Sequence, residues 1–171
     1  MDRNEWLGRL EMLHSRIRGG EDVEPADREW YRASRDRLMR GALERYNAWL
    51  AVGEKARTAV RVERALPVVL EGPGKPRHAV TVDMGAAGFG AILEDAPPEG
   101  TPFRARLALP DGELVARVTV APSATRGEVH RVSFAFDPEA REVRERVEDF
   151  LLDELLPRLL FWDEVLNRLE T

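Results

Sequence analysis

The sequence predicts an α+β protein in which a six-stranded antiparallel β-barrel or sandwich lies between helical segments. Two observations support this fold class. Apolar residues recur at helical spacing in both terminal parts of the 171-residue chain, whereas six short segments in the middle are typical of strands. Since no helical pattern separates these segments, antiparallel pairing is favoured over a parallel sheet with crossover helices. We expect an N-terminal helical region at residues 1–54, the β-domain at 55–137 and a C-terminal helical segment at 138–171.

The N-terminal region carries the patterns of two helices. Trp6, Leu10 and Leu13 recur at steps of three and four residues, and the pair at 19–20, both glycine, is a typical helix end. Pro25 fits the first position of a second helix. The apolar stripe of that helix consists of Trp30, Leu38, Ala42, Tyr46 and Trp49. These stripes are either the buried faces of a helical pair or a surface for a partner.

Six segments of the middle region are expected to form the strands. They span residues 60–70, 77–83, 88–94, 103–109, 113–120 and 129–136. Proline and glycine, which often mark turns, occupy several gaps between them, as in GPGKP and APPEG. Short strands at nearly even spacing are what a small antiparallel barrel or sandwich requires.

The C-terminal segment predicts a long apolar helix. Asp137 can cap it and Pro138 fits its first position, while Pro157 is expected to kink or split it. Two apolar rows run along this helix, and one face of a barrel cannot cover both. The residues in excess are Leu152, Leu156, Leu160 and Trp162. We expect them to pack on other helices, of the same chain or of a second copy, and we favour a homodimer.

Composition limits the classes of function. The chain has a net charge of −5 and no cysteine. An acidic protein is a poor candidate for broad binding to DNA or RNA, which depends on many unbalanced lysine and arginine contacts to phosphates. No apolar run is long enough to span a membrane and no secretory signal opens the chain, so we expect a cytoplasmic location.

The residues that usually carry catalysis are scattered. His14, His78 and His130 fall on a helix, a strand edge and a strand, without the spacing of a metal site. The segment GAAGFG lacks the lysine of a phosphate-binding P-loop, and no dinucleotide-binding helix follows it. We therefore expect a protein that is not an enzyme and that holds no metal or cofactor.

Two motifs remain. The segment VTVDMGAAGFGAIL, residues 80–93, has Asp83 as its only charged residue, followed by the almost bare run 85–88. Such a run either serves a tight turn or lets a ligand lie close to the backbone. The second motif is a pair of arginines, Arg57 and Arg61, four residues apart and leading into the first strand.

Together these motifs resemble those of the PilZ domain family, bacterial receptors for cyclic di-GMP. In that family the motifs R-x-x-x-R and D/N-x-S-x-x-G bind the dinucleotide on the surface of a barrel. Arg57 and Arg61 match the first motif. Asp83 and Gly88 match the ends of the second, and Gly85 stands where the family has serine. The resemblance implies a six-stranded barrel with a ligand site formed by Arg57, Arg61, Asp83, Gly85 and Gly88.

The chemistry of these residues suits the ligand. A guanidinium group presents a planar fork of donors to a phosphate or to guanine O6 and N7, and a carboxylate such as Asp83 can accept from guanine N1 and N2. The resemblance, which covers about residues 55–155, implies non-catalytic binding of cyclic di-GMP that alters contacts with an unidentified protein partner. The alternative is a degenerate PilZ-like adaptor or oligomerisation module that binds no nucleotide and acts through its helices.

Overall fold

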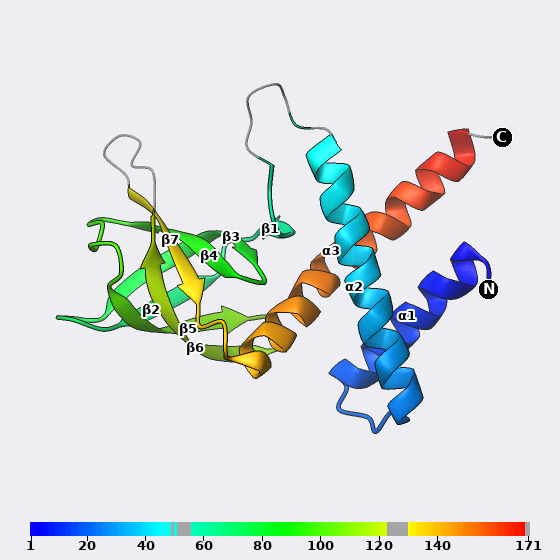
Figure 1. Ribbon diagram of the computed structural model, residues 1–171, viewed down its shortest axis with the longest axis horizontal. Helices are drawn as coiled ribbons and strands as arrows, with labels where there is room; N and C mark the ends of the chain where they lie inside the picture. The colour runs from blue at the N-terminus through cyan, green and yellow to red at the C-terminus, as the bar shows by residue number, and fades with distance from the viewer. Residues whose placement is uncertain (49, 51–55, 123–129, 170–171) are drawn as a thin grey trace. The chain divides into compact units, whose positions relative to one another are not determined.

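The chain forms two compact units (Figure 1). The computed structural model describes residues 1–48, 50, 56–122 and 130–169. The helical unit consists of residues 1–60 and 156–171, and the barrel unit consists of residues 61–155. Each unit has its own secondary structure and its own buried residues.

Two helices begin the helical unit. They are α1, Arg3–Arg18, and α2, Pro25–Ala48. A capping box starts α1, because the Asp2 carboxylate accepts from Glu5 N at 2.9 Å and the Glu5 carboxylate accepts from Asp2 N at 3.0 Å. Leu7, Leu10 and Leu13 form the buried face of α1. The predicted first helix is therefore confirmed.

The buried face of α2 differs from the predicted apolar stripe. Tyr31 and Arg35 are buried, whereas Trp30 is half-buried and Tyr46 is 41% exposed. Trp49, the last residue of that stripe, lies outside the described residues. A helical pair covers only one stripe of each helix, so the rest of the predicted stripe stays near the surface. The ring of Tyr46 is thereby accessible to other side chains.

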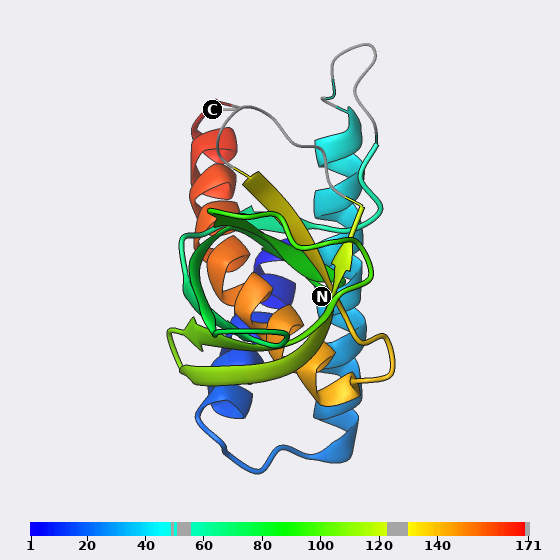
Figure 2. The same ribbon diagram turned by 90° about the vertical axis from the view of Figure 1, so that its left-hand side faces the viewer.

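Seven strands lie in the barrel unit. They are β1 (Arg61–Glu63), β2 (Pro67–Glu71), β3 (Arg77–Gly85), β4 (Gly88–Leu93), β5 (Pro102–Leu109), β6 (Gly112–Ala121) and β7 (His130–Phe136). Neighbours pair antiparallel in the order β1-β3-β2-β5-β6-β7-β4, and β4 also pairs with β3. This last pairing closes β2 to β7 into a ring, which Figure 2 shows. The predicted six-stranded antiparallel barrel is confirmed.

The first predicted strand, residues 60–70, is divided into β1 and β2. Both pair with β3, β1 near its C-terminal end and β2 in its N-terminal part. Between them the chain bonds to Thr81, whose hydroxyl donates to Arg64 O at 2.6 Å and accepts from Leu66 N at 2.9 Å. The β3–β4 register also shifts between Thr81 and Asp83. Such a bulge changes the direction of the side chains that follow it.

Apolar side chains fill the barrel. On β5 every second residue from Phe103 to Leu109 is buried, which is the alternation that predicted this strand. Phe89 stacks on Phe134 with 5.1 Å between ring centroids, and Phe103 meets Phe134 edge-on at 6.1 Å. Burying one such ring stabilises the fold by roughly 1.5–3 kcal/mol. This core fixes β4, β5 and β7, and with them the residues on their outer faces.

The C-terminal helix α3, Arg141–Leu169, begins later than the sequence predicts. Asp137 stabilises a turn instead, since its carboxylate accepts from Glu139 N at 3.0 Å and its carbonyl from Ala140 N at 3.2 Å. Pro138 lies within this turn. The predictions that Asp137 caps the helix and that Pro138 is its first residue were wrong.

The helix α3 continues through Pro157 and contributes to both units. Of the two expectations for Pro157, the split is wrong, because one helix runs from Arg141 to Leu169, and a long helix tolerates the loss of a single backbone donor. The kink stays a prediction. Leu152 and Leu156 are buried within the single chain, so they no longer require a second copy to cover them. The side chains of Leu160 and Trp162 lie outside the described part. None of the described helices combines the length and the apolar composition that crossing a bilayer requires.

Candidate functional site

The bare segment of the sequence forms the β3–β4 hairpin. Gly85 ends β3 and pairs with Gly88 at the start of β4, so only two alanines form the turn. Gly88 has a φ of 154°, and a Cβ atom there would collide with the Phe134 carbonyl oxygen of β7. For this glycine, close packing against β7 explains the missing side chain.

A second glycine of β4, Gly90, makes room for a carboxylate. Gly90 pairs with Asp83 across the hairpin and donates its N–H to Asp83 Oδ1 at 3.0 Å. A Cβ atom on Gly90 would lie 2.9 Å from that oxygen and 3.4 Å from Arg131 Nε. The absence of a side chain therefore lets Asp83 lie directly against the backbone of β4.

Two arginines converge on the Asp83 carboxylate. Arg61 Nη1 lies 3.1 Å from Oδ1 and 3.2 Å from Oδ2, and Arg131 Nη2 lies 2.6 Å from Oδ2. With the Gly90 N–H, both carboxylate oxygens accept from protein donors. Arg61, Asp83, Gly90 and Arg131 are hereafter called the Asp83 cluster. Its members come from β1, β3, β4 and β7, which are neighbours in the sheet.

Burial and charge give the Asp83 cluster its chemical character. The Asp83 side chain is 5% exposed, and a carboxylate so deeply buried is stable only when it is paired and hydrogen-bonded. The side chains of Arg61 and Arg131 remain 30% and 52% exposed. Each guanidinium group carries more N–H donors than Asp83 accepts. The cluster therefore presents a positive charge and free donors, which can bind a phosphate or the edge of a guanine.

The contacts of Asp83 differ from those expected from the sequence. Instead of presenting free oxygens to a guanine, Asp83 anchors Arg61 and Arg131. Neither Arg131 nor Gly90 was predicted as a site residue. Alternation along β7 identifies Arg131 only as an outward residue, and its contact with Asp83 depends on the order of strands, which the sequence does not reveal.

Gly85 lies beside the cluster. It is buried, and it faces Arg61 in the β1–β3 register. Among the glycines that the structure describes, those with positive φ do not include Gly85. A serine, which the family carries at this position, could therefore adopt the same backbone conformation.

Arg57 makes its described contacts within the helical unit. Its backbone N donates to Asn47 Oδ1 and its carbonyl accepts from Asn47 Nδ2, both at 2.9 Å. Its guanidinium group lies over the ring of Tyr46, 4.1 Å from the centroid. Of the predicted residues, the structure thus brings Arg61 and Asp83 into contact and places Gly85 and Gly88 in the same hairpin. Arg57 instead contacts Tyr46 and Asn47 of α2.

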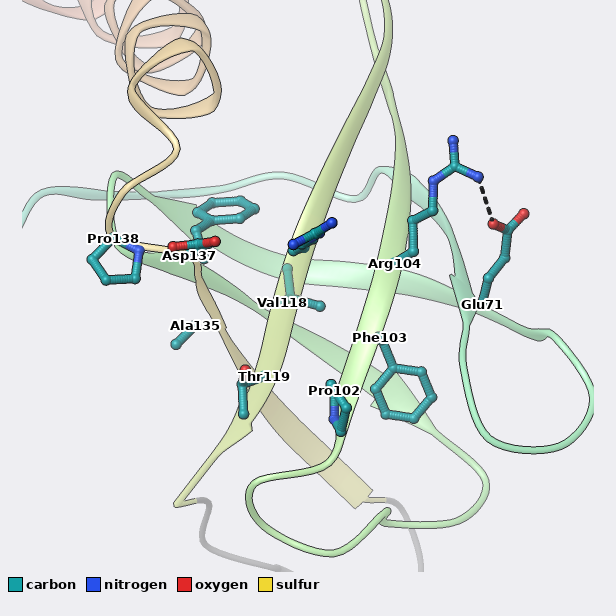
Figure 3. A pocket seen from close by; sticks show the side chains of 11 residues that line it. Glu71, Pro102, Phe103, Arg104, Val118, Thr119, Ala135, Asp137 and Pro138 are labelled. Carbon is teal, nitrogen blue, oxygen red and sulfur yellow. Dashed lines mark hydrogen bonds and ion pairs between the residues drawn. The ribbon is translucent and has the colours of Figure 1, made fainter.

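A separate cavity of about 550 Å³ lies on the barrel surface (Figure 3). Arg104 of β5 and Arg117 of β6 line it and face each other in the β5–β6 register. Arg104 points toward Glu71 and pairs with it at 3.3 Å, as the dashed line shows. No member of the Asp83 cluster lines this cavity. In the described part of the chain, no group of three or more histidine, aspartate or glutamate residues could hold a metal ion.

Comparison with known proteins agrees with this architecture. A family model of the PilZ domain matches residues 55–153. Among solved structures, the chain is similar to YcgR from Escherichia coli in complex with c-di-GMP, with a TM-score of 0.55 and 16% identity over 65% of this chain and 51% of that one. It is also similar to the MrkH–c-di-GMP complex of K. pneumonia, with a TM-score of 0.52 and 18% identity over 60% of this chain and 53% of that one. A third similar structure is the Bacillus subtilis inhibitor of motility, MotI/DgrA, with a TM-score of 0.51 and 15% identity over 61% and 53%.

The similarity to these three structures covers only part of each chain. The matched part spans about half the length of each of these three chains. At 15% to 18% identity the likeness concerns the fold. No curated protein sequence matches the chain.

Proposed function

The chain belongs to the PilZ domain family, and on this premise we propose that it is a non-catalytic receptor for cyclic di-GMP. The ligand site consists of the Asp83 cluster, Gly85 and Gly88 of the hairpin, and Arg57. The observation that supports this site best is the pair of half-exposed arginines, Arg61 and Arg131, anchored on one buried carboxylate.

The geometry of the Asp83 cluster suits a compact dianion with two guanine bases. A guanidinium plane pairs with a phosphate or with guanine O6 and N7, and it also stacks on a purine face. Because Asp83 orients both arginines before a ligand arrives, less side-chain ordering is needed on binding. The turn of the hairpin carries only the short side chains of Ala86 and Ala87, so a flat base can approach the backbone there.

Two of the similar structures support the choice of ligand. YcgR and MrkH are each described in complex with c-di-GMP. Their low identity to this chain means that they support a shared fold, whereas the assignment of residues depends on the contacts of the Asp83 cluster. The cavity beside Arg104 is not part of the proposed site, because it shares no residue with the cluster.

We also propose that occupancy of the site alters contacts with a protein partner. Arg57 is held within the helical unit and Arg61 belongs to the barrel unit. A ligand that binds at this motif orders the chain around it, and a partner that recognises the ordered form then responds to the ligand.

A homodimer is a further proposed assembly. Light scattering over a dilution series measures it, and a constant monomer mass would contradict it.

A second function is favoured by one residue. Gly85 lacks the hydroxyl group that the motif of the family carries, so the alternative is an adaptor that binds no nucleotide and acts through its helices. A direct measurement of cyclic di-GMP binding distinguishes the two functions, since only the receptor binds the nucleotide.

Calorimetric titration of the purified protein with cyclic di-GMP tests the proposal. The wild type binds, and Arg61→Ala and Arg131→Ala each weaken binding about tenfold or more, because each removes charge-assisted hydrogen bonds. The matched control is Arg104→Ala, which removes an exposed, ion-paired arginine of the same barrel and leaves the affinity unchanged. A wild type that is folded by circular dichroism but does not bind at high micromolar protein concentration would reject the receptor in favour of the adaptor.

A further inference from the structure

Arg57 contacts two residues of α2 that no motif includes. The side-chain amide of Asn47 both donates to and accepts from the Arg57 backbone, at 2.9 Å in each direction. This is the pattern by which one residue of a strand pairs with its neighbour. Asn47 therefore fixes the chain at Arg57 without using any donor of the guanidinium group.

Tyr46 orients the guanidinium group itself. The group lies over the ring, 4.1 Å from its centroid, and a contact of this kind uses the face of the guanidinium plane. The N–H donors lie in that plane and point outward from its edge. Within the described part of the chain, the Arg57 side chain makes no ion pair or hydrogen bond. Its donors are therefore available to a phosphate or a guanine.

We propose that Tyr46 and Asn47 are positioning residues for Arg57 in ligand binding. This inference rests on the proposed function, because it concerns the same ligand. Without Tyr46 the long Arg57 side chain samples many rotamers and loses that freedom when it binds. Without Asn47 the backbone at Arg57 loses its two fixed contacts. Both residues thus raise the affinity without touching the ligand themselves, because they act only through Arg57.

The test is a calorimetric titration with cyclic di-GMP of variants at residues 46 and 57. Tyr46→Ala weakens binding about threefold to tenfold, whereas Tyr46→Phe binds nearly as the wild type does, because a phenyl face also attracts a guanidinium group. In an Arg57→Ala background, Tyr46→Ala has no additional effect, since there is no longer a side chain to orient. Asn47→Ala weakens binding in the same direction. Glu44→Ala, an exposed residue of the same helix, is the matched control and changes the affinity less than about twofold.

Each other outcome overturns the inference. If Tyr46→Ala leaves the affinity unchanged or tightens it while Arg61→Ala weakens it, Tyr46 does not position Arg57, and the proposed function still stands. If the effects of Tyr46→Ala and Arg57→Ala add, Tyr46 acts by another route. If the wild type does not bind cyclic di-GMP, the proposed function fails and this inference fails with it. Circular dichroism of every variant separates these outcomes from loss of folding.

Discussion

Arg57 and Arg61 lie four residues apart in the sequence, yet their side chains are held in different ways, Arg57 by an aromatic ring and Arg61 by a carboxylate. Among the described residues, the arginine–aromatic contacts all fall in the helical unit. They are Arg9 over Trp30, Arg35 over Tyr31, Arg37 over Trp6 and Arg57 over Tyr46. Ion pairs occur in both units, since Arg9 also pairs with Asp27 at 2.6 Å, but Arg61 and Arg131 of the barrel unit share the carboxylate of Asp83.

The difference shows two ways of preparing an arginine for a ligand. A ring orients the guanidinium plane and leaves all of its donors free, but it adds no opposite charge. A carboxylate fixes the group more firmly and uses some of its donors. On the exposed side of the barrel the same pairing favours the charged form of an arginine, since hydrogen bonds and charge from Glu113 and then Glu71 raise the pKa of Arg106. Arg57 is thus held loosely with free donors, and Arg61 is held firmly with fewer.

The largest effect is expected when the carboxylate anchor of the barrel is removed. Asp83→Ala leaves Arg61 and Arg131 without their shared partner and the Gly90 N–H without an acceptor. Breaking a buried ion pair of this kind lowers the free energy of unfolding by about 2–4 kcal/mol, and binding of cyclic di-GMP should fall more than about tenfold. Urea denaturation and calorimetry measure the two effects. Glu113→Ala, which removes an exposed carboxylate partner of Arg106, is the control and should change stability by less than about 1 kcal/mol.

The two arginines of the motif should differ when each is removed. Arg57→Ala and Arg61→Ala are each expected to weaken binding by about 1.5–3 kcal/mol, but only Arg61→Ala should also destabilise the fold, because it leaves Asp83 with fewer donors. Calorimetry and urea denaturation of both variants make the comparison. Arg28→Ala is the control, since Arg28 and Arg32 have the same spacing within α2. Equal stability of the two motif variants would show that Asp83 does not depend on Arg61.

A smaller effect is expected from Gly90→Ala. The new Cβ atom would meet Asp83 Oδ1 at 2.9 Å, and that oxygen cannot easily move because its side chain is short, buried and bound to three donors. Overpacking of this kind costs about 1–3 kcal/mol of stability. Thermal denaturation checks the expectation. Gly41→Ala, where the added atom meets nothing within 4 Å, should not lower stability.

The smallest effect concerns the position where the chain departs from its family. Because Gly85 does not have a positive φ, Gly85→Ser should be accommodated and should add a hydroxyl bond of about 0.5–1.5 kcal/mol. Binding of cyclic di-GMP should tighten by about tenfold at most. Calorimetry on the variant and the wild type measures the change. Weaker binding together with lower stability would mean that the buried space at Gly85 does not admit a side chain.

The sequence predicts the fold better than the site. Burial determines where apolar residues recur along the chain, and this spacing can be seen in the sequence. Examples are the alternation along residues 103–109 and the helical spacing of Leu10 and Leu13. The Asp83 cluster depends on strand order and register, which bring Arg131 to a carboxylate 48 residues earlier in the chain. For the same reason Gly90 was predicted only as a residue of the strand at 88–94, without a role in the site. Asp137 was misassigned because an aspartate can cap either a helix or a turn.

The backbone amide of Gly90 can serve as a spectroscopic probe of the Asp83 cluster. Its proton lies between a backbone nitrogen and a buried carboxylate oxygen, so its exchange with solvent is slow only while Asp83 stays in place. Any ligand that draws Arg61 or Arg131 away from Asp83 changes the charge next to this proton and shifts its resonance. A single amide signal can therefore follow the site in solution without a mutation.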